Sequence, residues 1–173
     1  EADTDLFSPK KKKSKGDTAA SPVSKENLAI AKSWLASSDE YNLLVNGTAI
    51  TAFPVYYQND LALLRQSLRI VQAGTEVAEV KGKDLIPAHG LAMSRLLKTS
   101  VFSTEALTYE QAIAYLRKEA IVLPPSVPKG YVLVTYKEIP LGFVKNIGNR
   151  ANNLYPQEWR IRSGYLPDDI RTL

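Results

Sequence analysis

The residues best suited to chemistry lie between Pro140 and Arg162, where cations, amides and aromatic rings alternate. The basic residues there are Lys145, Arg150, Arg160 and Arg162. Between and beside them lie Phe143, Asn146, Asn149, Asn152, Asn153, Tyr155 and Trp159. Cations hold phosphates, amides read base edges and rings stack on unpaired bases, so the segment is compatible with RNA binding. Asparagines also suit loops and aromatic rings suit a core, so composition alone leaves both interpretations open.

Residues for catalysis are largely missing. The chain contains no Cys, which excludes thiolate nucleophiles, thiolate zinc sites and disulfides. The only His is His89. No acidic or hydroxyl residue lies at a sequence spacing that would suggest a catalytic partner, so we interpret His89 as a structural residue. No Gly-rich turn suits a doubly wound cofactor-binding domain. The sequence therefore predicts no catalytic residue, no metal site and no cofactor bound by this chain.

Composition narrows the class of protein further. The chain has 173 residues, 45% of them hydrophobic, and a net charge of +4, which is compatible with a nucleic-acid partner. No apolar run approaches the roughly 20 residues of a membrane span, so we expect no membrane partner. Residue 1 is Glu and the only Met is Met93, so we expect a fragment of a longer protein.

The elements that must position these residues begin after a linker. Residues 1–23 are charged and rich in Ser, Pro and Gly, which predicts a flexible tether. Ser24 predicts a helix N-terminus, and Asn46-Gly47 predicts a hairpin between two apolar runs. Thr108 and Gln111 form a capping box that predicts a further helix.

Other segments carry weaker signals. We expect a helix capped by Asn59, strands at 69–73 and 76–80, and a helix from Pro87 through Leu97. Strands are predicted at 131–136 and 139–145, with a tight connection at Lys137-Glu138, and a last strand at 159–162. Short strands mixed with short helices predict an α+β fold built on a small barrel.

From Leu107 onward the chain resembles a known family. The matching features are Leu107 to Ala112, Lys129 to Val134, Pro140 to Lys145 and Asn153 to Pro156, with Trp159-Arg160. Together with the upstream segment 73–97, they resemble the C-terminal PUA-like region of Sun/Fmu-type (RsmF-like) ribosomal RNA cytosine-C5 methyltransferases. Phe143 stands where the family usually has Trp, and Asn152 stands where it has Lys.

The resemblance implies both an organisation and a function. It implies a flexible linker at 1–23, an N-terminal α+β part at 24–103 with one helix first, and a PUA-like RNA-binding domain at 104–173. Enzymes of this family use S-adenosylmethionine and a cysteine nucleophile, both belonging to a domain outside this chain. The chain is then expected to dock structured ribosomal RNA in the cytoplasm, during ribosome biogenesis, for its own N-terminal methyltransferase domain.

The expected RNA contacts are exposed side chains around the last strands. They are Lys145, Asn146, Arg150, Asn152, Asn153, Tyr155, Arg160 and Arg162. An alternative stays open, in which the chain is a structural or protein-interaction domain that braces the catalytic domain and barely touches RNA. An exposed basic groove would favour RNA, and a buried cluster of Lys145 and Arg160 would favour bracing.

Overall fold

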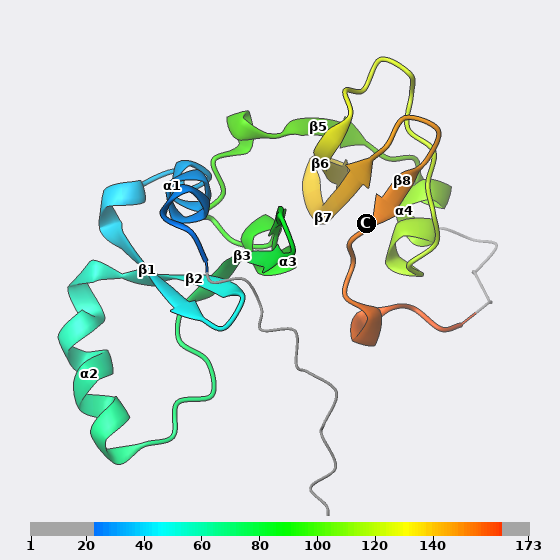
Figure 1. Ribbon diagram of the computed structural model, residues 1–173. Helices are drawn as coiled ribbons and strands as arrows, with labels where there is room; N and C mark the ends of the chain where they lie inside the picture. Colours follow the sequence, from blue (N-terminus) through cyan, green and yellow to red (C-terminus); the bar gives the residue numbers. More distant parts are fainter. Residues whose placement is uncertain (1–22, 164–173) are drawn as a thin grey trace, which may run out of the picture.

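The computed structural model describes residues 23–163, which form two four-stranded sheets with short helices. In Figure 1 the sheet β1–β4, with α1 and α2, lies to the left, and the sheet β5–β8, with α4, lies to the right. The short helix α3 lies between them. The predicted tether at 1–23 falls outside the described residues except for Val23. No helix within residues 23–163 is long and apolar enough to cross a membrane.

The first sheet is an antiparallel meander. Its strands are β1 (Tyr41–Asn46), β2 (Ala49–Pro54), β3 (Thr75–Lys81) and β4 (Asp84–Pro87). The helix α1 (Lys25–Ser33) precedes it, α2 (Gln58–Ser67) lies between β2 and β3, and α3 (His89–Ala92) follows β4. Two predictions are confirmed here, because Ser24 caps α1 through a hydrogen bond from the Asn27 amide and the Asn46-Gly47 hairpin forms.

Three predictions in this half are wrong. Asn59 lies inside α2, because a 3-10 turn at Val55–Tyr57 leads directly into the helix. Residues 69–73 form no strand, and β3 pairs with β4 instead. Pro87 ends β4 and opens no helix through Leu97; the ladder continues as the Ala88 amide donates to the Val77 carbonyl, and α3 is a single turn.

The second sheet carries the segment that the sequence singled out. Its strands are β5 (Ser103–Ala106), β6 (Gly130–Tyr136), β7 (Ile139–Asn146) and β8 (Ala151–Asn153), with β5 parallel to β6. The capping box of Thr108 and Gln111 starts α4 (Tyr109–Leu116), as predicted. The tight β6–β7 connection also forms, with positive φ at Lys137 and Glu138.

The α+β class is confirmed, and two details differ from the prediction. The sheets do not close into one barrel: within residues 23–163, β5 and β8 remain opposite edges of the second sheet. Residues 159–162 form no strand. Instead Gln157–Trp159 is a 3-10 turn, and the Ile161 amide donates to the Leu116 carbonyl at the end of α4.

Strict side-chain alternation buries both faces of the second sheet. Val132, Val134 and Val144 face α4 and form one core with Tyr115. Leu133 and Phe143, one residue out of step, face the first sheet and join its core. A chain of rings crosses that junction, with Trp34 and Phe102 centred 5.2 Å apart and Phe102 and Phe143 4.8 Å apart.

We predict that the two halves unfold together. Phe143→Ala removes a buried ring from the shared core and should lower the free energy of unfolding by about 3–5 kcal/mol. Tryptophan fluorescence, to which both Trp34 and Trp159 contribute, and far-ultraviolet circular dichroism should report the same single transition. The matched control, Ile139→Ala, lies on the same strand but is 63% exposed, so it should change stability by less than about 0.5 kcal/mol. Two separate transitions would contradict the shared core.

Candidate nucleic-acid interface

The end of β7 and the start of β8 determine which side chains reach solvent. Lys145 pairs in register with Asn152, so these two side chains share one face of the sheet. Asn146 and Ala151 share the other face, and both are buried. The predicted site residues are therefore divided between an outer and an inner surface.

Lys145 is held by the first sheet. Its Nζ lies 2.7 Å from Oδ2 of Asp84 on β4 and 5.5 Å from the ring centre of Tyr131. The hydrogen bond that Lys145 donates to Asp84, and then the neighbouring Tyr131, raise the pKa of Lys145, so its charge is retained. Lys145 thus links the two sheets and presents a fixed cation.

Asn146 is not an exposed contact residue, which corrects the prediction. Its Nδ2 donates to the carbonyls of Val127 and Pro128 at 3.0 and 3.1 Å, and its Oδ1 accepts from the Gly148 amide at 3.0 Å. The amide group therefore satisfies backbone groups of the 121–129 loop and of the β7–β8 turn. A buried amide with all of these partners is a structural element.

Asn153 also has a structural role. Its Nδ2 donates to the carbonyls of Tyr115 and Glu119 at 2.7 and 2.9 Å, and its Oδ1 accepts from the Tyr155 amide at 2.8 Å. These bonds tie β8 to the C-terminal end of α4. The expectation that Asn153 is a free amide for base recognition is therefore wrong.

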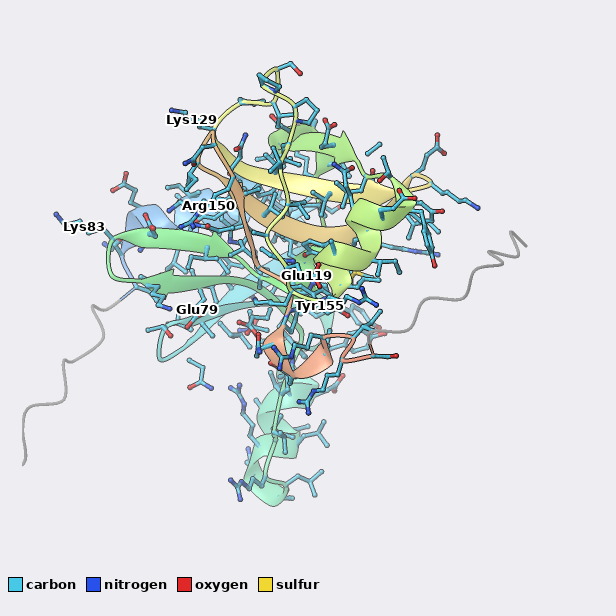
Figure 2. All side chains as sticks on the ribbon, turned by 90° about the vertical axis from the view of Figure 1, so that its right-hand side faces the viewer. Glu79, Lys83, Glu119, Lys129, Arg150 and Tyr155 are labelled. Carbon is cyan, nitrogen blue, oxygen red and sulfur yellow. The ribbon has the colours of Figure 1, made fainter. Side chains whose placement is uncertain are left out.

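A basic surface remains around the β7–β8 turn. Arg150 and Asn152 are exposed, and a β-carbon at Gly148 would lie 2.9 Å from Cε of Lys129, so Lys129 packs on this turn. Lys83, beside Asp84 in the β3–β4 turn, reaches the same flank, as Figure 2 shows for Lys83, Lys129 and Arg150. We call the exposed group Lys83, Lys129, Arg150 and Asn152 the basic face.

Arg160 and Arg162 lie elsewhere. They line a separate cleft of about 310 Å³ with Arg117, whose Nη2 donates to the Ser163 carbonyl at 2.9 Å. Arg160 and Arg162 therefore do not share a site with Lys145. Tyr155 is half-buried, with ring centres 5.1 Å from His89 and 5.4 Å from Tyr115, so it packs between elements.

His89 lies where the two halves meet. A β-carbon at Gly142 on β7 would lie 2.9 Å from Nδ1 of His89 and 2.2 Å from the Tyr115 hydroxyl, so only Gly fits there. Nδ1 is buried and makes no hydrogen bond within the described residues. Burial, and then the charge of Lys118, lower the pKa of His89. The structural interpretation of His89 agrees with this packing.

Sequence reasoning missed Lys83 and Lys129 as members of this surface. Lys83 follows Gly82 in the β3–β4 turn, and predicting that hairpin would have brought it toward Lys145. Lys129 precedes β6, and its side chain packs against Gly148. This contact joins segments that are distant in the sequence, so local patterns do not reveal it. Within residues 23–163, no group of three His, Asp or Glu side chains could hold a metal ion.

Comparison with known proteins supports the resemblance. Residues 102–161 match the family described as the methyltransferase RsmF PUA domain. Ribosomal RNA small subunit methyltransferase F of Enterobacter sp. (strain 638) is 29% identical over 138 residues, which cover 80% of this chain and 27% of that protein. The same-named protein of Shigella boydii serotype 4 (strain Sb227) is 26% identical over 160 residues, covering 92% of this chain and 30% of that protein. The chain therefore spans less than a third of the length of the curated relatives it matches.

We predict opposite outcomes for two asparagines. Asn146→Ala leaves buried backbone groups without partners and should cost about 2 kcal/mol of stability. Asn152→Ala, on the exposed face, should change stability by less than about 0.5 kcal/mol. Chemical denaturation of both variants measures the contrast. Equal effects would mean that Asn146 is not the buried anchor described above.

Stability should also depend on the protonation of His89. Its pKa in the folded chain lies below its ordinary value of 6.5, so the unfolded chain takes up the proton first as the pH falls. The stability that depends on neutral His89 is fully present above about pH 7. It is lost as the pH drops below 6.5 toward the lowered pKa. Thermal melts between pH 7.5 and 5.5 should show this loss.

His89→Phe is the matched control, because it keeps a ring at the junction and removes the only histidine. The variant also keeps Glu76, whose pKa is raised by burial and then by Glu79. Glu76 therefore changes the pH dependence of stability in the direction opposite to His89. The difference between the two proteins therefore isolates the histidine. Identical pH dependence in both would refute the assignment.

Proposed function

We propose, on the premise that residues 102–161 form a PUA domain of the kind found in methyltransferase RsmF, that this chain docks structured RNA. The observation that carries the proposal is the basic face. Lys83 and Arg150 come from two turns and Lys129 from the 121–129 loop, and all three are exposed on one flank. Exposed cations gathered in this way suit the phosphates of a folded RNA.

Local charge balance supports the same conclusion. Asp84, a carboxylate next to the basic face, is paired with Lys145 and contributes little free negative charge. Asn152 lies in register beside Lys145 and offers a donor and an acceptor between the cations. The face can therefore grip phosphates and contact an unpaired base at the same place.

The names of the relatives support a proposed activity for the parent protein. They are named ribosomal RNA small subunit methyltransferase F, so small-subunit ribosomal RNA is the proposed partner. In this proposal, S-adenosylmethionine and the nucleophilic cysteine belong to a methyltransferase domain outside these 173 residues. The present chain would bring the RNA to that domain, in the cytoplasm where ribosomes are assembled.

A second function, bracing of the catalytic domain, is favoured by one observation. The helix α2 projects from the molecule, with Leu61 as its only buried residue (Figure 1). Leu63 on α2, and Leu68 and Val71 in the segment that follows it, are 63%, 58% and 94% exposed. Apolar side chains gathered on a projecting element are typical of a protein contact. This surface lies on the first sheet's side and does not compete with the basic face.

The basic face predicts how RNA affinity depends on salt. The double variant Lys129→Ala, Arg150→Ala should bind a structured fragment of small-subunit ribosomal RNA more weakly. The slope of log affinity against log salt should become shallower by about 1–2, as expected for two lost phosphate contacts. Filter binding or fluorescence anisotropy from 50 to 200 mM salt measures both effects.

The lysines at 10–13 are the main confounder, so all proteins in this test carry Lys10 to Lys13 changed to Ala. The matched control changes Lys137 to Ala; Lys137 is also an exposed lysine and lies at the opposite end of the β6–β7 hairpin. Equal affinity of the double variant and its parent would show that the site is wrong. No RNA affinity at low salt in any of the proteins would favour bracing.

A further inference from the structure

A second cleft separates the first sheet from the chain that follows β8. It has a volume of about 780 Å³ and lies between β3, β4 and α3 on one side and residues 154–159 on the other. Both halves of the molecule build it, so it is not a feature of the PUA segment alone. None of the residues of the basic face lines it.

Trp159 forms one wall of this cleft. It is 60% exposed, although its ring is held edge-on against His89, with ring centres 5.3 Å apart and planes at 77°. The Trp159 amide donates to the Pro156 carbonyl, which fixes the 3-10 turn that carries the ring. An indole that is anchored at one edge and open to solvent is a preformed surface for stacking.

The facing wall carries two carboxylates placed by a β-bulge. Thr51 pairs with Glu76 while Ile50 pairs with Ala78, so Val77 is an extra residue in β3. Val77 and Ala78 are both buried, and the alternation is shifted by one residue beyond them. As a result Glu76 and Glu79 both line the cleft despite their odd spacing.

The charges of the cleft disfavour a bare anion as its ligand. Three carboxylates, Glu76, Glu79 and Glu158, face two ammonium groups, Lys81 and Lys118. The Lys118 ammonium already donates to the Tyr155 carbonyl. Within residues 23–163 no cation pairs with Glu76 or Glu79. The cleft thus offers hydrogen-bond acceptors beside an aromatic surface, which is the reverse of a phosphate site.

We propose that this cleft binds one unpaired nucleobase, with guanine preferred, stacked on Trp159 and hydrogen-bonded to Glu76 and Glu79. Ionised carboxylates only accept hydrogen bonds, so they select base edges rich in N–H groups. Guanine presents two adjacent donors on its Watson–Crick edge, its ring imino group and its exocyclic amine, whereas uracil presents one donor between two acceptors. The proposal rests on the RNA-binding function above and names a base-specific contact for it.

The fluorescence of Trp159 reports whether a base binds in the cleft. The sequence contains two tryptophans, and the other, Trp34, is 6% exposed in the shared core. Neutral nucleosides are the probes, because they lack phosphate and do not depend on the basic face. Titration of the full chain with guanosine should quench the exposed tryptophan, at concentrations at least about fivefold below those that cytidine, adenosine or uridine require. That factor corresponds to about 1 kcal/mol of discrimination.

Variants test each wall separately. Trp159→Leu should abolish the quenching. Glu76→Gln and Glu79→Gln should each weaken guanosine binding about fivefold or more and remove the preference over uridine. Glu79 is exposed, so its variant keeps the test decisive if the half-buried Glu76 cannot be changed without unfolding. Glu138→Gln, in the β6–β7 turn, is the matched control and should bind guanosine normally.

Two outcomes would overturn the proposal. One is equal quenching, or none, by all four nucleosides up to their solubility limits. The other is quenching by arginine amide alone, which would mean that the carboxylates receive a basic protein side chain. If the chain binds no guanosine while its RNA affinity still depends on Arg150, this inference alone is rejected and the proposed function stands. Guanosine binding without any RNA affinity would instead reject the proposed function.

Discussion

Burial of the β5–β8 sheet on both faces is the constraint on which the rest of the structure depends. Val132, Val134 and Val144 pack toward α4, while Leu133 and Phe143 pack toward the first sheet. A sheet that is covered on both sides has no free face for a ligand. Functional side chains are therefore confined to strand ends, turns and the segments that leave the sheet. This is why the basic face lies at the β7–β8 turn and the second cleft lies beyond β8.

The two covering layers meet at one glycine. Gly142 has φ of +142° and leaves no room for a β-carbon between the Tyr115 hydroxyl and His89. The Tyr115 hydroxyl donates to the Phe143 carbonyl at 3.2 Å, and burial raises the pKa of Tyr115 well above its ordinary value. Tyr115 belongs to α4, His89 to α3 and Gly142 to β7. This close approach, together with the shared core around Phe143 and the Lys145–Asp84 pair, fixes the relative position of both halves.

The sequence predicted local features well and long-range ones poorly. Ser24, the Asn46-Gly47 turn, the Thr108–Gln111 box and the Lys137-Glu138 turn act within a few residues, and all of them formed as expected. Asn146 and Asn153 were predicted as exposed contacts because the prediction used only their polar side chains and their places near a loop. Their partners, Val127, Pro128, Tyr115 and Glu119, lie 18 to 38 residues away, and only the fold brings them together. The same reason explains why Lys83 was missed and why the arginines at 160 and 162 were grouped with Lys145.

In the proposed RNA complex, the two surfaces would contact different parts of one RNA. The basic face offers exposed cations and one exposed amide, which match a backbone with occasional base contact. The second cleft offers acceptors and an indole, which match a base and repel a phosphate. Asn152 and Pro156 are four residues apart, so the chain between them spans at most about 14 Å. A strand of RNA whose phosphates lie on the basic face could therefore turn one base past β8 toward Trp159. Because β8 is fixed to α4 through Asn153 and to β7 through the sheet, the distance between the basic face and the second cleft is set by the fold. In the proposed RNA complex, such preorganisation would lower the entropy cost of binding and make the register of the RNA depend on which base can enter the cleft.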